Sequence, residues 1–432
     1  MNLVKRAQAS SMWQTGAGLS ISDMDRMMDA QYGGSPSYTG KAVSQTTALA
    51  VSTLWRCVNA ISCDMAMLPQ YVYKRIDGGA AREMARKHYL WSLLNYAANP
   101  ELSSFDFYQL MQAWLLLWGN AYAEIVIDGG RTNGPGKVTA LWPWRPDRTK
   151  VERAYRGGPL QYRFRMEQGQ WSAPVPRERM FHIRGFSLDG ILGMSPVEVH
   201  KQTIGLNMAM TEHAGRYFSN NSVPPGVLYT DKQLGDVAFE RLKANWATSH
   251  EGLDNAHRIA ILEQGLKWQS TGGDMLASQW VESKKVTQYE IVDMFNMPAH
   301  RAGLLDRATN NNIEEQALEY VIYTLGPWAA KWQNQTHCDL LSDRENAFYY
   351  TAFDFKNLLR GNHESMAKFI AAMRQWGIMN ADECREYLLD MNPQPNGTGK
   401  TYWQPVNIMP ADGDGPSAQD QARMRLVPEG KE

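Results

Sequence analysis

Residues 193–198 of the chain read GMSPVE, and this stretch separates two kinds of sequence. Ser195 and Glu198 have the spacing of a capping box, and Pro196 stands at the first helical position, where a backbone N–H is not needed. The stretch therefore predicts the start of a long helix that runs to about Ser219.

The sequence before this stretch contains two helical patterns and several short alternating runs. Apolar residues recur every three or four positions from Val51 to Leu68, which predicts an amphipathic helix that Pro69 ends. A strand is expected at 71–74 and a second helix at 104–118. Glycine-rich turns separate the remaining runs, which is typical of an antiparallel meander. These runs are 121–127, 138–142, 150–155, 160–165 and 180–184.

Long helical patterns dominate the sequence after Ser219. A strand at 226–230, a helix around Phe239 and a strand at 257–262 form a compact unit, and a helix is expected from 274 to 297. The longest helix is expected to begin at Asn312, and its apolar face comprises Ile313, Ala317, Val321, Leu325, Trp328 and Trp332.

Pro327 interrupts the hydrogen bonding of that longest helix. Proline has no N–H to donate to the Tyr323 carbonyl, so we expect a kink at this place. A strand at 348–355 and two short helices should come next, the second capped by Asn380 and Glu383.

The composition is that of a folded protein of one to three domains. The chain has 432 residues, 44% of them hydrophobic, and its 44 Lys and Arg nearly balance 45 Asp and Glu. Such a near-neutral chain is not suited to tight binding of nucleic acid or of an anionic membrane. The uncharged stretch 107–123 is too short to span a bilayer, so we expect a soluble protein with a buried helix that runs into a strand there.

Motifs of catalysis and of cofactor binding are incomplete in this sequence. Residues 397–401 read GTGKT, but Gln394 stands where a phosphate-binding loop needs its first glycine. Ser195 lies in a GxS order, but Val197 replaces the second glycine of a nucleophile elbow. Histidines and cysteines lack metal-site spacing. We therefore expect no enzyme activity, no cofactor, no catalytic residue and no metal site.

Two stretches admit both a structural and a functional interpretation. Residues 137–184 carry 11 Lys or Arg against 4 Asp or Glu. They form either a solvated sheet face or a surface that faces DNA or an acidic partner. Residues 299–312 read AHRAGLLDRATNNN and form either a linker between helices or a functional loop.

Several segments, in a fixed order, resemble the portal proteins of tailed double-stranded DNA bacteriophages, specifically the HK97-type portal family. The segments span about residues 46–395 and include 54–61 (LWRCVNAI), 117–122 (LWGNAY), 140–143 (ALWP), 181–185 (FHIRG), 190–196 (GILGMSP), 225–228 (PGVL), 265–268 (GLKW), 312–316 (NIEEQ) and 325–328 (LGPW). The turn at 128–136 looks longer than is usual in the family, and both termini are unmatched.

The resemblance implies an α+β fold of the portal type, with long stem and tunnel helices, a mixed α/β wing with antiparallel strands, and a small α/β clip. By analogy the parts are a flexible arm (1–45), wing (46–194), stem helix (195–222), clip (223–273), stem helix (274–297), tunnel loop (298–312), kinked tunnel helix (313–340), wing return strand (341–356), crown (357–410) and disordered tail (411–432).

The resemblance also implies a passive function. Portal proteins of this type form a ring, usually a dodecamer, at one capsid vertex around a channel for double-stranded DNA. The terminase large subunit, a separate motor ATPase, packages the genome, which is later ejected. Head-tail adaptor (neck) proteins and capsid or scaffold proteins would be further partners. The protein would reside in the virion, and in the host cytoplasm during assembly, without contact to a membrane.

The site residues implied by the resemblance lie in the loop, its helix and the clip. Arg301 and Arg307 are candidates for transient phosphate contacts, and Leu304 and Leu305 for the narrowest apolar constriction. Asn310 and Asn311 complete the tunnel loop, and Pro327 marks the helix kink. The surface of the clip that faces the motor or neck would include Arg241, Lys243, Trp246 and Arg258.

Two alternatives stay open at this point. The same protein can serve a gene transfer agent or a defective prophage, which neighbouring genes would distinguish. A metal-dependent DNA-processing enzyme would need clustered carboxylates, whereas Asp274, Glu282, Asp293 and Asp306 are dispersed.

Overall fold

The computed structural model describes most of the chain. The described residues are 35–76, 81–128, 137–155, 157–166, 169–219, 226–229, 235, 237, 239–241, 267–270, 274–304, 318–355, 363–388 and 391–402. The chain divides into two compact units, Met1–Asp354 and Phe355–Glu432.

Two helices that the sequence predicts form the centre of the first unit. Helix α4 (Ser52–Met67) packs against α6 (Ser104–Trp118), and the predicted apolar face of α4, including Leu54 and Ile61, is buried. At the end of α6, Gly119 has a φ of 73°, in the left-handed region, so the chain turns directly into a strand. The stretch is a buried helix that runs into a strand, as predicted.

Buried polar contacts join this centre to helix α12 (Gly326–Asp339). Trp332 Nε1 donates to Gln112 Oε1 at 2.9 Å, and Tyr108 OH donates to Gln70 Oε1 at 2.6 Å. All four side chains are buried. Because a buried polar group without a partner is costly, these pairings fix the relative positions of α6, α12 and the strand that begins at Gln70.

The described part of the first unit contains three antiparallel sheets of three strands each, and all the strands predicted before residue 195 are present. The sheets have the orders β13-β3-β4, β10-β5-β6 and β7-β8-β9. The bounds are β3 (Gln70–Ile76), β4 (Ala81–Met84), β5 (Asn120–Asp128), β6 (Lys137–Trp144), β7 (Thr149–Arg153), β8 (Leu160–Phe164), β9 (Val175–Pro176), β10 (Met180–Arg184) and β13 (Tyr349–Phe353).

The prediction of one continuous meander is wrong. β5 and β6 form a hairpin, but β10 returns to the other side of β5 and places His182 opposite Tyr122. β7, β8 and β9 make a sheet of their own. An alternating pattern shows which face of a strand is buried but not which strand it pairs with. β13 lies antiparallel to β3, which confirms the returning strand.

The first unit also contains short helices. They are α5 (Tyr89–Asn95), α13 (Asp343–Asn346) and the 3-10 turns η2 (Pro146–Arg148) and η3 (Arg177–Arg179).

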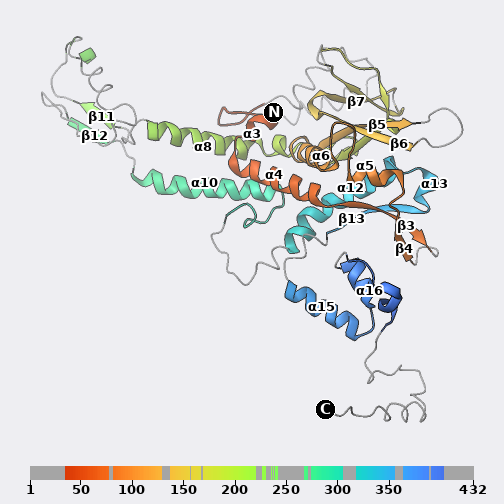
Figure 1. Ribbon diagram of the computed structural model, residues 1–432. Coiled ribbons are helices and arrows are strands. Elements are labelled where there is room, and N and C mark those ends of the chain that lie inside the picture. The colour runs from red at the N-terminus through yellow and green to blue at the C-terminus, as the bar shows by residue number, and fades with distance from the viewer. Residues whose placement is uncertain are drawn as a thin grey trace, which may run out of the picture. The chain divides into compact units, whose positions relative to one another are not determined.

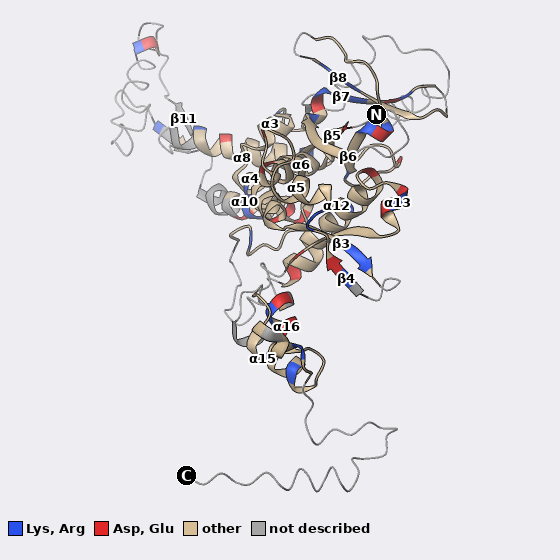
Figure 2. Cartoon of the chain, turned by 45° about the vertical axis from the view of Figure 1, so that its right-hand side comes forward, with Lys and Arg blue, Asp and Glu red and all other residues tan. Residues whose placement is uncertain are grey.

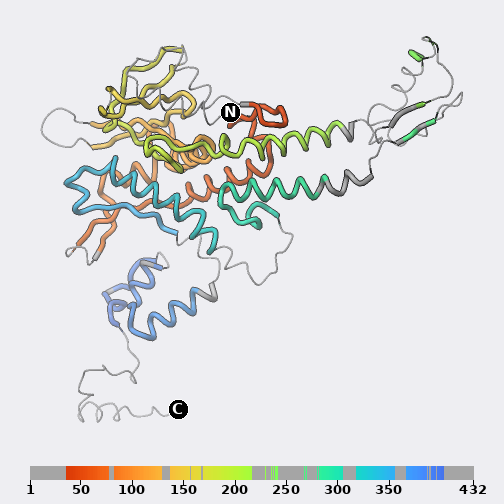
Figure 3. Tube along the Cα trace, turned by 180° about the vertical axis from the view of Figure 1, so that it is seen from behind, coloured from red at the N-terminus to blue at the C-terminus, as the bar shows by residue number. Residues whose placement is uncertain are grey.

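The helix predicted at Ser195 is present in two pieces. Ser195 caps α7 (Pro196–Val199) by accepting a hydrogen bond from the Glu198 N–H at 3.2 Å. The backbone leaves helical geometry at His200 before α8 (Lys201–Ser219) begins. Helix α10 (Asp274–Met294) ends three residues earlier than the predicted residue 297. Figures 1 and 3 show α8 and α10 side by side, with α4 beside α10.

The irregularity expected at Pro327 takes the form of a π-helical segment, η6 (Tyr320–Leu325), directly before α12. Pro327 thus lies in the first turn of α12, where proline is tolerated. The π segment also shifts the buried face, since Ala329 is 2% exposed whereas the predicted Trp328 is half-buried. The predicted helix start at Asn312 lies outside the described residues, and the bend itself stays a prediction.

The prediction of a flexible arm over residues 1–45 is wrong for its last eleven residues. Strands β1 (Ser35–Pro36) and β2 (Ala42–Val43) pair, and α3 (Gln45–Ala48) comes next with a capping box at Ser44. Polar contacts to α8 hold this hairpin, and such long-range contacts leave no periodic signal in a short polar segment.

Strands β11 (Gly226–Tyr229) and β12 (Lys267–Ser270) pair between α8 and α10 in the sequence. β11 confirms the first predicted strand, whereas the strand predicted at 257–262 lies outside the described residues. In the structure, β11 pairs with β12.

The second unit contains α15 (His363–Gln375), α16 (Ala381–Glu383), the π-helical η7 (Cys384–Leu388) and the 3-10 helix η8 (Pro395–Lys400). The predicted capping box of Asn380 and Glu383 is complete, with bonds of 2.8 and 2.9 Å. The GTGK stretch lies in η8 and forms a short turn rather than a strand-led phosphate loop.

Candidate functional site

The longest described helices of the chain, α8 and α10, form an antiparallel pair that extends from the body of the first unit (Figure 1). Asn207 Nδ2 donates to Thr287 Oγ1 at 2.9 Å across the pair, and both residues are buried. Ile204 and Ile291 are buried nearer the body. The buried hydrogen bond fixes how far one helix slides along the other.

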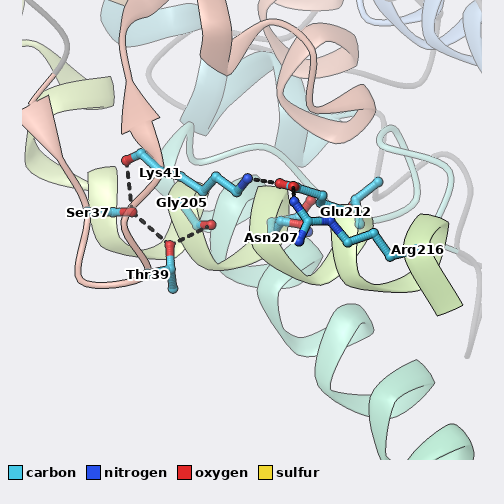
Figure 4. Close-up of polar contacts among 8 residues, drawn as sticks. Ser37, Thr39, Lys41, Gly205, Asn207, Glu212 and Arg216 are labelled. Carbon is cyan, nitrogen blue, oxygen red and sulfur yellow. Dashed lines mark hydrogen bonds and ion pairs between the residues drawn. The ribbon is translucent and has the colours of Figure 1, made fainter. Parts of the chain in front are cut away.

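The β1–β2 hairpin is fastened to α8 by polar contacts (Figure 4). Thr39 Oγ1 donates to the Gly205 carbonyl at 3.1 Å, and Lys41 pairs with Glu212, which also pairs with Arg216. A side chain at Gly205 would begin 2.3 Å from Ser37 Oγ, so only glycine permits this approach. The hairpin thus stiffens the part of α8 that lies nearest the body.

The turn that comes after α10 is held against the π segment η6. Asn296 adopts a φ of 50°, its Nδ2 donates to the Tyr323 carbonyl at 2.7 Å, and its own carbonyl accepts from Thr324 Oγ1 at 2.5 Å. The two segments on either side of residues 305–317 therefore lie in contact with each other.

A second contact between the same two segments is centred on Asp64 of α4. Asp64 Oδ2 accepts from Arg301 Nη2 at 2.6 Å and from Tyr320 OH at 2.7 Å. The Arg301 guanidinium also lies 4.7 Å from the centre of the Tyr320 ring. Asp64 is 14% and Arg301 is 42% exposed, so the pair lies at the edge of the protein surface.

The pKa values of the donors agree with a stable charged pair. Burial works to lower the pKa of Arg301, but the Asp64 carboxylate and the Tyr320 hydroxyl outweigh it, and the pKa is raised. Burial, and after it the charge of Asp64, raises the pKa of Tyr320 far above its usual range. Tyr320 therefore keeps its proton at neutral pH and donates it to the Asp64 carboxylate.

Arg56 supports the same turn from α4. Its Nε donates to the Arg301 carbonyl at 3.1 Å, and its guanidinium lies so close to Gly303 that a Cβ there would be 2.4 Å from Nη1. Gly303 has a φ of 82°, in the left-handed region. Two side chains of α4 thus hold the turn that leads out of α10.

Another junction brings together three of the segments on which the family resemblance rests. Asn120 Nδ2 donates to the Gly193 carbonyl, and Asn120 Oδ1 accepts from the Gly193 N–H, both at 2.8 Å. Asn120 Oδ1 also faces His182 Nε2 at 3.2 Å, and Tyr162 OH faces His182 Nδ1 at 3.1 Å. Since Asn120 Oδ1 is an acceptor, Nε2 carries the proton of a neutral imidazole.

Burial explains why this imidazole is neutral. It lowers the pKa of His182 well below the ordinary value of 6.5, and Arg184 and Arg177 lower it further. Ser195 Oγ donates to the Leu117 carbonyl at 2.7 Å in the same region. The junction therefore joins the sheet of β5 to the start of α7, and its groups are occupied with structural bonds rather than presented to a substrate.

Figure 2 marks the described Lys and Arg residues of the basic segment 137–184 in blue, and four of them form ion pairs within the chain. Glu152 pairs with Lys150 at 2.7 Å and with Arg163 at 2.8 Å, and Arg177 pairs with Asp339 at 2.8 Å. Arg145 pairs with Asp147 at 2.8 Å. These pairs favour the interpretation of the segment as a solvated sheet face.

The structure describes four of the predicted site residues. Arg301 is bound to Asp64 rather than free, Leu304 is half-buried, Pro327 lies in the first turn of α12, and Arg241 is exposed on a helical stretch. The other predicted residues lie outside the described residues: Leu305, Arg307, Asn310, Asn311, Lys243, Trp246 and Arg258.

Sequence reasoning missed Asp64, Tyr320 and Arg56. A weak signal was available, because Asp64 interrupts an otherwise uncharged half of α4 directly before the buried Met65. Its partners lie 237 and 256 residues away, and only the fold reveals such contacts.

No group of three or more potential metal ligands occurs among the described residues. Glu282 and Asp293 both lie on α10, about 16 Å apart along its axis. The helices that the structure describes include none long and apolar enough to cross a bilayer.

The chain matches the family of phage portal proteins over residues 52–388. It is 27% identical over 359 residues to the portal protein of Enterobacteria phage HK97, and the match covers 82% of each chain. It is 25% identical over 388 residues to the probable portal protein of Streptomyces phage phiC31, covering 87% of this chain and 82% of that protein.

Among solved structures, the chain is similar to one from the neck of a native gene transfer agent particle, computed with C12 symmetry. The TM-score is 0.54 and the identity 21%, over 81% of this chain and 92% of the other. This likeness concerns the fold, and it agrees with a mixture of helices and antiparallel sheets.

Proposed function

The chain belongs to the phage portal protein family, of the HK97 type, and on that premise we propose that its copies form a ring, of twelve subunits, around a channel for double-stranded DNA. The observation that carries the proposal is the family match over residues 52–388. The C12 symmetry of the similar gene transfer agent neck supports the subunit number.

In this ring the α8–α10 pair is the stem, the sheets of the first unit form the wing, and the β11–β12 segment belongs to the clip. The second unit is the crown. The long helix pair with its buried Asn207–Thr287 bond supports the assignment of the stem, because a stem must keep its shape while DNA passes.

The proteins of this family are structural, and the ring provides a passive channel for DNA. A separate motor ATPase, the terminase large subunit, drives packaging at the clip, where Arg241, Lys243, Trp246 and Arg258 face the motor and later the neck proteins. Capsid or scaffold proteins contact the wing, and assembly takes place in the host cytoplasm before the ring becomes part of the virion.

Contact with DNA is weak and independent of sequence. A net charge of −1 supports this, because many phosphate contacts would slow sliding. Arg307 is the candidate for transient phosphate contact, with Leu304 and Leu305 as the apolar constriction and Asn310 and Asn311 beside them. Arg301 holds the base of the loop, since its guanidinium is bound to Asp64.

Electron microscopy of the negatively stained protein, with its mass in solution, tests the ring. We expect rings with a central channel and a mass of about 587 kDa, twelve times 48.9 kDa. A chain that stays monomeric at every concentration, and also when produced together with its capsid and scaffold proteins, would refute the ring.

Shortening the chain between residues 305 and 311 tests the channel loop. Rings should still form, while genome packaging or retention should fail. Normal packaging by the shortened protein would exclude the loop from channel function.

A gene transfer agent is the second candidate setting for the same ring, favoured by the likeness to the gene transfer agent neck. The genes that neighbour this one decide between the two settings.

A further inference from the structure

Asp64 binds two segments of the chain through a single oxygen atom. Arg301 Nη2 and Tyr320 OH both donate to Asp64 Oδ2, at 2.6 and 2.7 Å. The donors also contact each other, because the Arg301 guanidinium lies 4.7 Å from the centre of the Tyr320 ring. The three side chains form a closed triangle in which each member touches the other two.

The two donors of this triangle lie on either side of residues 305–317 in the sequence. Arg301 precedes residues 305–317 by four positions, and Tyr320 lies three positions after them. Both ends of this stretch are therefore held at one carboxylate of α4. Because fixing the two ends of a loop restricts the conformations between them, Asp64 restricts the whole stretch.

The neighbouring contacts would keep the surrounding fold intact without Asp64. Phe295, Met297 and Leu325 of the two segments are buried, and Asn296 bonds to both Tyr323 and Thr324. In the triangle, Tyr320 is buried, whereas Arg301 is 42% exposed. Loss of Asp64 should thus loosen the loop ends rather than unfold the subunit.

We propose that Asp64 is a positioning residue, which holds the two segments on either side of residues 305–317 together on α4. The proposal rests on the proposed function, in which these segments flank the loop of the DNA channel. Asp64 then supports this loop from its base without contacting DNA.

Trypsin cleavage after Arg307, monitored by mass spectrometry, reports the freedom of the loop directly. Asp64→Asn removes the charge but keeps the size of the side chain, and should speed cleavage roughly ten-fold or more, as expected for loss of hydrogen bonds to a charged group. Asp147→Asn is the matched control, because Asp147 pairs with Arg145 in the wing at 2.8 Å. Its cleavage rate should equal that of the wild type.

Tyr320→Phe tests the same triangle with a smaller change. It removes the hydroxyl but keeps the ring beneath Arg301, so cleavage should speed up less than in Asp64→Asn. In the double variant, cleavage should be no faster than in Asp64→Asn alone, because both changes break one contact. Fully additive effects of the two changes would overturn the triangle as a unit.

The functional readout is genome retention in particles built with each variant. Rings of Asp64→Asn and Tyr320→Phe should form with the wild-type mass, while the yield of filled particles falls. Wild-type cleavage rates and yields in both variants would overturn the proposal. Faster cleavage with normal yields would instead remove the stretch from the channel, which separates failure of the proposed function from failure of the clamp.

Discussion

At the scale of single residues, Gly119 and Gly193 lie where two stretches of backbone cross. A Cβ at Gly193 would stand 1.9 Å from the Gly119 carbonyl oxygen, and a Cβ at Gly119 would stand 2.0 Å from the Met194 carbonyl oxygen. The obstacles are backbone atoms, which cannot rotate away. Gly119 of LWGNAY and Gly193 of GILGMSP are thus required by this crossing rather than by turn formation alone.

Gly193→Ala should therefore destabilise the protein by about 2 kcal/mol or more. Gly215→Ala is the control, since Gly215 lies in α8 with no atom within 4 Å of its Cβ position. That change should stabilise the protein by up to about 1 kcal/mol, through helix propensity. Urea unfolding measures both, and equal effects of the two changes would contradict the crossing argument.

Because of His182, the protein should lose stability as the pH becomes acidic. The unfolded chain binds a proton at this residue below its ordinary pKa of 6.5, whereas burial keeps the folded imidazole neutral. Stability due to this group is therefore present above pH 6.5 and is lost as the pH falls below it. The loss between pH 8 and pH 5.5 should be about 1.4 kcal/mol.

Unfolding free energies of the wild type and His182→Gln at both pH values measure this contribution. The variant should be less stable at pH 8 but should lose less stability on acidification. His213→Gln, at an exposed position on α8, should keep the wild-type difference. The same acid loss in His182→Gln as in the wild type would contradict the assignment.

At the scale of elements, the π segment shows what periodicity in a sequence does and does not reveal. The sequence predicts a buried face through Val321, Leu325 and Trp328, and the first two are buried. After η6 the buried face continues through Ala329 in place of the predicted Trp328, and then through Trp332 as predicted. A π turn takes in an extra residue and rotates the later part of the helix by about 100° around its axis. Pro327 indicates from the sequence where the helix is irregular. The type of irregularity, a π segment, depends on how the helix packs before and after this place.

Asn207 and Thr287 provide a test of the α8–α10 helix pair. Asn207→Ala leaves the buried Thr287 hydroxyl without its donor and should cost about 1–3 kcal/mol. The double variant Asn207→Leu with Thr287→Val removes both polar groups and should recover part of that loss. Thr211→Ala, at an exposed position of α8, should change stability by less than about 0.5 kcal/mol.

Denaturant unfolding of these variants decides whether the bond matters for the fold. If the double variant is less stable than Asn207→Ala, then the packing of these two side chains stabilises the site more than their hydrogen bond does.

At the scale of the whole molecule, the two units have unequal cores. The first unit buries three sheets and several helices around residues such as Leu54 and Trp332. In the second unit, Phe369, Trp376 and Ile378 are 46%, 59% and 60% exposed. The first unit therefore has the means to fold without the second.

A chain that ends at residue 362 should accordingly keep cooperative unfolding, with a midpoint within a few degrees of that of the full chain. A chain that ends at residue 346 is the control, because it lacks β13 and so removes one of the two antiparallel partners of β3. Thermal unfolding monitored by circular dichroism distinguishes the two. Failure of the longer truncation to fold would show that the units depend on each other.

The helices of the body, most strands, the caps at Ser195 and Asn380, and the resemblance to the portal family could all be predicted from the amino-acid sequence. These features depend on neighbouring residues, whose periodicity and capping chemistry are local. Three contacts are evident only in the folded chain: β10 pairs with β5, the hairpin at residues 35–43 is held on α8, and Arg301 is bound to Asp64. Each of these contacts joins residues far apart in the sequence, and their free energy depends on burial that exists only once the chain has folded.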